Sequence, residues 1–379
     1  MAEERSRGRT TKRRRFLATA GALGAAGLAG CSDSLDGNGD GNGNVSDSPV
    51  GQIGSGREGR DAPGGTPMSE MPELSGELTV YSGRGEFLVG DLISYIDDLY
   101  DDLELTVRYA GSTDLVNQIV NEGDGSPADV FYSVNAGSLG ALADEGRTRP
   151  LSDQVRETVP EEFRTEEWVG TSGRARTIPY NTGVYDESDL PSDILAYEEF
   201  DGQLGWAPSY GSCQAFVTAL RLLEGNDRAE QWVENVVDGG IQAYNDEFAV
   251  SQAVADGELD AGFANHYYIQ RVLDNSPDAP IDTAFTSGDA GAVFNVAGAA
   301  VIDETDDPEL AENFVRHLLS AEVQEYFAVE TFEYPTNPGV SPVGALPSIA
   351  ELDVPDIDLT ALSDLEPTIE LMRDAGAQV

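Results

Sequence analysis

Apolar and polar positions follow two different periods along the chain. At 78–81 they alternate with period two, which predicts a strand, and a glycine-bearing turn leads into a helix whose apolar positions between Phe87 and Leu99 recur every three or four residues. The same order of strand, turn and helix recurs over 105–120, and a third strand is predicted at 127–132. Strands that alternate with helices through short loops favour an α/β fold with a parallel sheet covered on both faces.

Longer loops interrupt this pattern in the second half of the chain. Short strands and turns follow Ser172, a helix is predicted at 214–223, and Asp307 and Pro308 begin another helix with proline in its first turn. The roughly 300 residues after residue 76 are enough for two domains, each with a core of its own.

The first 30 residues are typical of an export signal. A twin-arginine pattern at 11–17 leads into an apolar run at 16–30, which is shorter than the ~18 residues that a membrane span needs. The run ends in Leu-Ala-Gly-Cys at 28–31, which matches the site at which lipoproteins are cleaved and lipid-modified. We therefore expect a mature chain that begins at Cys31 and is anchored by lipid to the outer face of the cell membrane.

The segment that follows Cys31 is rich in Gly, Asp, Asn and Ser, most clearly at 36–44. A segment with so few apolar residues cannot bury enough surface to offset its loss of conformational entropy. The sequence therefore predicts a disordered tether over 31–75.

The chain is strongly acidic, with 69 acidic and 22 basic residues. Without the two acidic and seven basic residues of the leader, 67 acidic and 15 basic residues remain, a net charge of −52. Such a surface repels nucleic acid and anionic lipid. Because molar salt shortens the screening length to ~3 Å, we interpret the composition as a halophilic adaptation similar to that of haloarchaeal proteins.

The sequence offers little that favours an enzyme. Besides Cys31 it has one cysteine, Cys213, which we interpret as a packing residue, so no internal disulfide is expected. It contains no set of nucleophile, base and acid, no phosphate loop with lysine and no zinc-type histidine spacing.

Two adjacent tyrosines, Tyr267 and Tyr268, are the strongest candidates for chemistry. They follow a predicted buried strand at 259–263 and precede a helix-like run at 269–273, so they are expected in a strand-to-helix loop, where open α/β sheets bind ligands. Adjacent aromatic residues in a loop are more often packing residues. A phenolate, however, is a hard anionic donor whose proton a highly charged cation displaces, and ferric iron is the cation that we favour.

Four motifs carry a resemblance to a known family. They are Val-Tyr-Ser-Gly-Arg at 80–84, Pro-Ala-Asp-Val-Phe-Tyr at 127–132, Ser-Gly-Arg-Ala-Arg at 172–176 and Asn-His-Tyr-Tyr at 265–268. In order and separation they resemble the ferric-ion-binding proteins, the extracytoplasmic substrate-binding proteins of iron(III) ABC importers. The resemblance extends from residue 76 to the C-terminus.

The resemblance implies a two-lobed, periplasmic-binding-protein-like α/β fold of type II, with hinge strands and a cleft between the lobes. The expected divisions are a signal at 1–30, a tether at 31–75, a first lobe from 76–176 and 298–345, and a second lobe from 177–297 and 346–379.

The resemblance also implies a ligand set. Tyr267 and Tyr268 match the ligand tyrosines of the family, and Arg174 matches an arginine that holds a synergistic anion such as carbonate. Glu86 stands close to where some members have a histidine. Tyr210 lies near the position of a third tyrosine in others, so both are candidate metal ligands.

These features predict an extracytoplasmic receptor that binds Fe(III) and delivers it to an ABC permease and its ATPase. We expect a monomer that contacts the membrane through its lipid anchor alone and does not bind nucleic acid. The alternative is the same fold used for another solute, such as a phosphonate, a thiamine-like cation or a ferric chelate.

Overall fold

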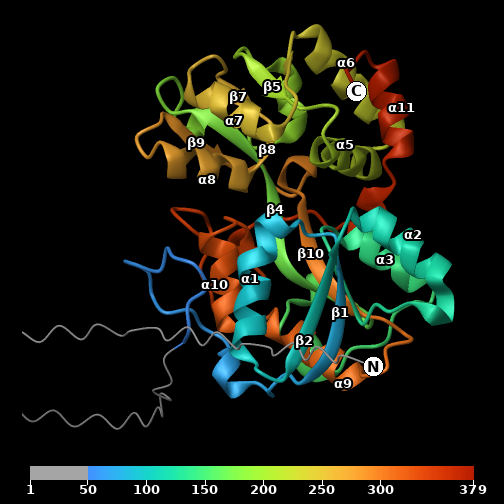
Figure 1. Cartoon of the computed structure of the whole chain (residues 1–379). Coiled ribbons are helices and arrows are strands. Elements are labelled where there is room, and N and C mark those ends of the chain that lie inside the picture. The colour runs from blue at the N-terminus through green and yellow to red at the C-terminus, as the bar shows by residue number, and fades with distance from the viewer. Residues whose placement is uncertain (1–49) are drawn as a thin grey trace, which may run out of the picture. The chain divides into compact units, whose positions relative to one another are not determined.

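The computed structural model describes residues 50–379, and its N-terminal part follows the predicted alternation of strands and helices (Figure 1). The elements in chain order are β1 (Gly76–Ser82), α1 (Glu86–Leu99), β2 (Leu103–Tyr109), α2 (Ser112–Glu122), β3 (Val130–Ser133) and α3 (Ala136–Asp144). Helix α1 forms where the period predicts it, because Val89, Leu92 and Ile96 share one buried face. The predicted signal at 1–30 and Cys31 lie outside the described residues.

A mixed sheet organises this part of the molecule. Strand β1 pairs in parallel with β2 and β3, and β10 (Phe294–Val301) then adds antiparallel to β3 and to the long strand β4 (Trp168–Asn181). The sheet order is therefore β2-β1-β3-β10-β4. We call the elements around β1, β2 and β3 the β1 lobe.

Strand β4 changes partners halfway along its length. Up to Ala175 it pairs with β10 and with β11 (Tyr334–Pro335). From Arg176 onward it pairs with β8 (Ala264–Asn265), β9 (Ile281–Ala284) and β7 (Ala261–Gly262). Strand β5 (Leu204–Trp206) lies parallel to β7 and to β6 (Gln242–Ala243). We call the elements around β5, β6 and β7 the β5 lobe, and β4 runs through both lobes (Figure 1).

The remaining helices pack on these sheets. The α-helices are α4 (Asp153–Arg156), α5 (Gly211–Glu224), α6 (Asn226–Asp238), α7 (Glu247–Ala255), α8 (His266–Asn275), α9 (Pro308–His317), α10 (Ala321–Val329) and α11 (Glu366–Asp374). The 3-10 helices are η1 (Met68–Glu70), η2 (Gly123–Gly125), η3 (Glu161–Phe163), η4 (Glu187–Asp189), η5 (Ile194–Glu199), η6 (Ala290–Ala292), η7 (Ile349–Glu351) and η8 (Leu359–Ser363). Within residues 50–379, none of the helices is both long and apolar enough to cross a bilayer.

Large aromatic side chains fill the core of the β5 lobe. The rings of Phe216, Trp232 and Phe263 lie with centroids 5.6 to 5.7 Å apart, and all three side chains are fully buried. Burial of a side chain of this size stabilises the fold by ~1.5–3 kcal/mol. Because Phe216 belongs to α5 and Trp232 to α6, this cluster fixes the positions of both helices.

The sequence predicts a flexible tether up to residue 75, and the structure differs from this expectation over 50–75. Ile53 and Leu74 are at most 2% exposed, and the Nε of Arg57 donates to both carboxylate oxygens of Glu325 at 2.8 and 2.9 Å. A few apolar side chains and the Arg57 guanidinium are enough to order this segment. It needs no core of its own, because it packs on the surface of α10.

Candidate functional site

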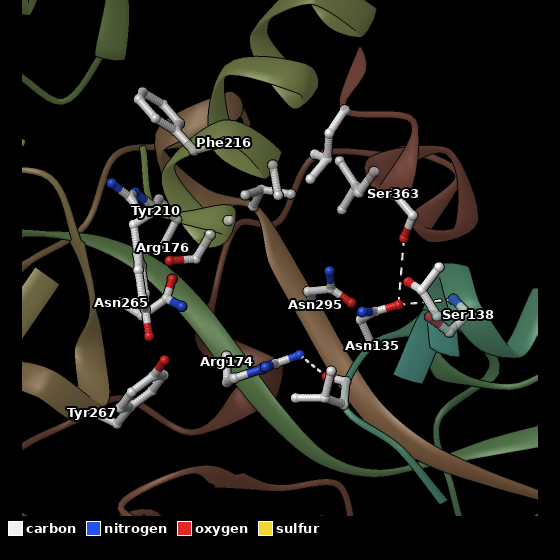
Figure 2. Close-up of a pocket in the computed structure, with 18 residues that line it drawn as sticks. Asn135, Ser138, Arg174, Arg176, Tyr210, Phe216, Asn265, Tyr267, Asn295 and Ser363 are labelled. Carbon is white, nitrogen blue, oxygen red and sulfur yellow. Dashed lines mark hydrogen bonds between the residues drawn. The ribbon is translucent and has the colours of Figure 1, made fainter. Parts of the chain in front are cut away.

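A cavity of about 340 Å³ lies where β4 and β10 meet the N-terminal ends of α3, α5 and α8. In Figure 2, Tyr210, Asn265 and Tyr267 form one wall and Asn135 faces them from the other, with Arg174 between the two walls. The first three residues come from the β5 lobe and Asn135 from the β1 lobe. The cavity therefore draws its lining from both lobes.

The tyrosine pair lies in the first turn of α8, and not in the loop that the sequence predicts. Strand β8 pairs with β4, and the Thr177 hydroxyl donates to the carbonyl oxygen of Ala264 at 2.8 Å, so the chain is held up to Asn265. The helix starts at His266, immediately after this fixed point. As a result, the rings of Tyr267 and Tyr268 lie with centroids 4.2 Å apart.

Tyr210, the residue that precedes α5, joins the pair. Its hydroxyl and that of Tyr268 are 2.6 Å apart, within hydrogen-bonding distance. Tyr210 and Tyr267 line the cavity, and Tyr268 contacts this lining through the hydroxyl of Tyr210. The structure thus brings Tyr210 together with two adjacent tyrosines that lie 57 and 58 positions further along the chain.

The surroundings of the pair control its ionisation. Burial raises the pKa of Tyr267 and of Tyr268 above the usual value of a phenol, and for Tyr268 the neighbouring Tyr267 adds to the effect. Both phenols are therefore neutral near pH 7, and a cation that binds them must displace their protons. The guanidinium of Arg271 lies 5.0 Å from the ring centroid of Tyr267 and 5.4 Å from that of Tyr268, where its charge favours the phenolate forms.

Arg174 extends into the space between the two walls. Its Nη2 donates to the carbonyl oxygen of Val134, at the edge of the β1 lobe (Figure 2). A guanidinium carries five N–H donors in a planar fork, so one backbone contact leaves donors for a ligand in the cavity. This position is compatible with the anion-binding role that the resemblance implies.

Glu86 is not among the residues that line this cavity. It is the first residue of α1 in the β1 lobe, where its side chain is exposed. A carboxylate at that position also interacts favourably with the helix dipole. The structure thus brings Tyr267, Tyr268, Tyr210 and Arg174 together and leaves Glu86 apart from them.

Arg176 also lines the cavity, although no role is predicted for it from the sequence. Its side chain is only 1% exposed and forms an ion pair with Glu247, whose second carboxylate oxygen accepts from the backbone N–H of Asn265 at 3.0 Å. Among the described residues, Nε and Nη2 of Arg176 have no hydrogen-bond partner. A signal was present, because residues two apart on a strand face the same side and Arg174 was already a candidate.

Further polar groups surround the cavity. Asn135 and Asn295 line it, and so does Ser212, whose hydroxyl has no partner among the described residues. Ser212 belongs to the first turn of α5, where backbone N–H groups lack helical partners and favour anions. The lining contains two arginines and neither a carboxylate nor an imidazole. Residues 50–379 also contain no cluster of three or more His, Cys, Asp or Glu that could hold a metal.

Two other residues near the pair are structural. His266 is fully buried, its Nδ1 lies 3.2 Å from the backbone nitrogen of Ala175, and it is not part of the lining. Cys213 is a buried free thiol, and burial raises its pKa to about 12. This agrees with the interpretation of Cys213 as a packing residue and not as a nucleophile.

Two α/β lobes joined by long strands, with a polar cavity where the lobes meet, define the class of periplasmic binding proteins. The model of the family of bacterial extracellular solute-binding proteins matches residues 92–325. The iron-bound HitA structure from Pseudomonas aeruginosa is similar with a TM-score of 0.69 and 29% identity, over 80% of this chain and 100% of that chain. The ferric binding protein of Campylobacter jejuni, at 21% identity and a TM-score of 0.66, supports the fold alone.

Sequence comparison narrows the class. The chain is 30% identical over 313 residues to the major ferric iron-binding protein of Neisseria meningitidis. This match covers 79% of this chain and 93% of that protein. It is 28% identical over 310 residues to the Fe(3+)-binding periplasmic protein of Serratia marcescens, over 79% and 90% of the two chains. The chain therefore belongs to the ferric iron-binding proteins among the bacterial extracellular solute-binding proteins, and it is a solute-binding protein and not an enzyme.

Proposed function

We propose that this protein binds Fe(III) through the phenolate oxygens of Tyr267 and Tyr268, with Tyr210 as a third oxygen donor. The observation that carries the proposal is the convergence of three phenols at the cavity, with the Tyr210 and Tyr268 hydroxyls 2.6 Å apart. Phenolate is a hard anionic ligand suited to a highly charged cation, and Arg271 above two of the rings favours the ionised forms. The relatives named above, whose names state ferric iron binding, support the same solute.

We further propose that the iron is bound together with an anion such as carbonate. The cavity lining has no carboxylate or imidazole that could complete the coordination of the metal. Arg174 provides a planar fork for the anion, and the unpaired Nη2 of Arg176 and the first turn of α5 add further donors. The exogenous anion supplies the missing oxygen ligands and balances the charge of Arg174, since Arg176 is already paired with Glu247.

We propose that Glu86 becomes a metal ligand when the lobes close. We assign one lobe to 76–176 and 298–345 and the other to 177–297 and 346–379. The change of partners along β4 between Ala175 and Arg176 supports a hinge there. When the lobes close, Glu86 approaches the bound iron from the β1 lobe as an additional carboxylate ligand.

Export and delivery complete the proposal. A twin-arginine signal directs the chain across the membrane, and lipid on Cys31 holds it at the outer face, where it works as a monomer. The receptor delivers its iron to an ABC permease and the associated ATPase. The acidic composition, with a net charge of −47 for the whole chain, supports a protein adapted to high salt.

A second candidate solute is an organic anion such as a phosphonate or a preformed ferric chelate. The observation that favours it is the lining itself, which offers two guanidinium groups and the side-chain amides of Asn135, Asn265 and Asn295. Such groups suit the oxygens of a phosphonate or a carboxylate. In that case the tyrosines form an aromatic wall of the pocket and do not ligate a metal.

Equilibrium dialysis against ferric citrate in molar salt distinguishes the two solutes. The Tyr267→Phe/Tyr268→Phe variant removes both hydroxyls and keeps both rings, so ferric binding should fall at least 100-fold, whereas an organic anion should lose much less. Tyr244→Phe, in the β5 lobe and outside the cavity lining, is the matched control and should bind like the wild type. Wild-type affinity for iron in the double variant would exclude phenolate ligation.

A further inference from the structure

The C-terminal segment is seated on α3 of the β1 lobe. The 3-10 helix η8 packs against α3 at Gly137 and Gly140, which share one face of that helix. A Cβ atom added at Gly140 would lie 2.6 Å from Cγ2 and 2.9 Å from Cβ of Thr360, and one added at Gly137 would lie 1.6 Å from Oγ of Ser363. The contact therefore requires glycine at both positions.

The other end of the same segment is held by the β5 lobe. Helix α11 packs on α5 and α6. The hydroxyls of Thr368 and Thr218 are 2.8 Å apart, and Nε of Arg221 donates to the Thr368 hydroxyl at 3.1 Å. Both partners of Thr368 lie on α5, the helix whose first turn borders the cavity.

Between these two anchors the segment forms a wall of the cavity. Leu362, Ser363 and Leu365 belong to the lining, and the Ser363 hydroxyl donates to Oδ1 of Asn135 at 3.4 Å (Figure 2). The segment is thus a connection between the β1 and β5 lobes that is separate from β4 and β10. The sequence expectation, which assigns 346–379 to the second lobe alone, does not include this contact with α3.

We propose that residues 359–365 form a clasp that holds the two lobes together over the bound solute and slows its release. The inference rests on the proposed function in one respect, namely that the solute occupies this cavity. Only Asp364 and Leu365 connect η8 to α11, so the lobes can move far apart only if η8 leaves α3 or α11 leaves α5. The clasp therefore raises the free energy of the open state and lowers the rate at which the solute escapes.

Release kinetics test the clasp. Fe(III)-loaded protein is mixed with excess EDTA, and iron loss is followed by visible absorption. In Gly140→Ala the added Cβ displaces Thr360, so release should become at least tenfold faster while the spectrum of the loaded protein stays the same. Gly125→Ala is the control in the same lobe, because a Cβ there meets no atom within 4 Å, and it should release iron at the wild-type rate.

A compensating change separates the clasp from general damage to α3. Thr360→Gly removes all three atoms that the new Cβ would meet within 4 Å. The double variant Gly140→Ala/Thr360→Gly should therefore return to within about threefold of the release rate of Thr360→Gly alone. A wild-type rate in folded Gly140→Ala, or a double variant as fast as Gly140→Ala, would overturn the clasp.

A readout without iron keeps this result independent of the proposed function. If the wild type binds no ferric iron, the proposed function fails, and the clasp is then judged by amide hydrogen exchange over 359–365 in metal-free protein. Faster exchange in Gly140→Ala, reversed in the double variant, supports the clasp. Exchange equal to that of the wild type contradicts it.

Discussion

The side chains of Tyr267 and Tyr268 are buried phenols with a raised pKa, and the charged residues around them change this pKa. Burial raises the pKa of both groups, and the charge of Arg174 opposes this increase at Tyr267. The guanidinium of Arg271 lies over both rings, where a positive charge stabilises a phenolate. In the proposed site the phenolic protons leave when the metal arrives, so acidification must weaken binding. Arg271 lowers the free energy needed to remove the phenolic protons, and it does so without contacting the metal.

Replacement of Arg271 by glutamine should weaken ferric binding at pH 7. A cation–π contact contributes ~1 kcal/mol, which corresponds to about fivefold in affinity. The loss should be the same at every pH between 6 and 9, because the pKa of both phenols lies above this range and the same number of protons is displaced in both proteins. The measurement is ferric affinity between pH 6 and 9. Arg108→Gln is the matched control, since Arg108 lies 5.5 Å from the ring of Tyr81. A ferric affinity of Arg271→Gln equal to that of the wild type at every pH would contradict the role assigned to Arg271.

His317 should make the fold less stable in acid. Its Nδ1 lies 2.6 Å from the carbonyl oxygen of Asn313, which can only accept, so Nε2 is free to accept from the Tyr100 hydroxyl at 2.7 Å. Burial lowers the pKa of His317 to about 4. Below pH 6.5 the unfolded chain binds a proton that the folded chain does not, so up to ~3 kcal/mol of stability is lost between pH 6.5 and 4.

Denaturant midpoints of the wild type and of His317→Gln, measured at pH 7.5, 6, 5 and 4, check this expectation. The variant should be less stable at pH 7.5, because it loses the hydrogen bond to Tyr100, but its stability should fall less steeply with acid. Parallel pH dependences of the two proteins would show that His317 does not titrate in this way.

At the scale of elements, buried ion pairs connect parts of the fold that the sequence keeps far apart. Glu247, the first residue of α7, joins Arg176 on β4 to the backbone of Asn265 at the start of α8. Arg84, after β1, likewise pairs with Glu333 next to β11, at 2.7 Å. Burial alone would raise the pKa of Glu333, but Arg84 and Arg174 hold it below the usual value. The first pair fixes β4 and the start of α8, which border the cavity, and the second joins the ends of β1 and β11.

Removal of one charge from such a pair should be costly. Glu247→Gln leaves the Arg176 guanidinium buried without its counterion, and the free energy of unfolding should fall by ~3–5 kcal/mol. Asp153→Asn is the control, because Asp153 pairs with Arg156 at the surface, where its side chain is 77% exposed, and should cost less than ~1 kcal/mol. Equilibrium denaturation in one fixed salt concentration gives both values. Similar losses in the free energy of unfolding of the two variants would contradict a larger contribution from the buried pair.

On the scale of the whole molecule, the net charge is expected to have the largest effect on how stability depends on salt. The chain carries a formal charge of −47, and its acidic residues are spread along the entire sequence. Salt shortens the range of the mutual repulsion from ~10 Å at 0.1 M to ~3 Å at 1 M. The folded state concentrates this charge more than the unfolded chain does, so its stability should depend strongly on salt.

The melting temperature should therefore rise steeply as KCl is increased from 0.1 to 2 M. Sucrose at matched water activity is the control, because it stabilises folded proteins without screening charge. A salt series with no larger effect than sucrose would contradict the halophilic interpretation.

Periodicity predicts much of the fold because it reflects local geometry. The strand expected at 78–81 appears as β1, the helix carrying Phe87 to Leu99 as α1, and the helix after Asp307 as α9, with proline in its first turn. The tyrosine pair was likewise visible from residue type alone. Its place inside the first turn of α8 was not, because that depends on the pairing of β8 with β4.

Long-range contacts account for what the sequence could not predict. Arg176 appears in a quoted motif, yet only the fold shows that it is buried against Glu247, 71 positions away, and lines the cavity. The docking of residues 50–75 on α10 depends on a surface that later residues create. The contact of η8 with α3 joins parts of the chain more than 200 positions apart, for which no local pattern exists.

The most direct test of the central claim is the visible absorption spectrum of the chain without residues 1–31, titrated with ferric citrate in molar salt. Phenolate ligation predicts a tyrosinate-to-iron charge-transfer band that grows to a one-to-one end point and disappears in Tyr267→Phe/Tyr268→Phe. Absence of the band in folded wild-type protein would contradict phenolate ligation. The cavity would then be the pocket of an organic or phosphorus-containing anion.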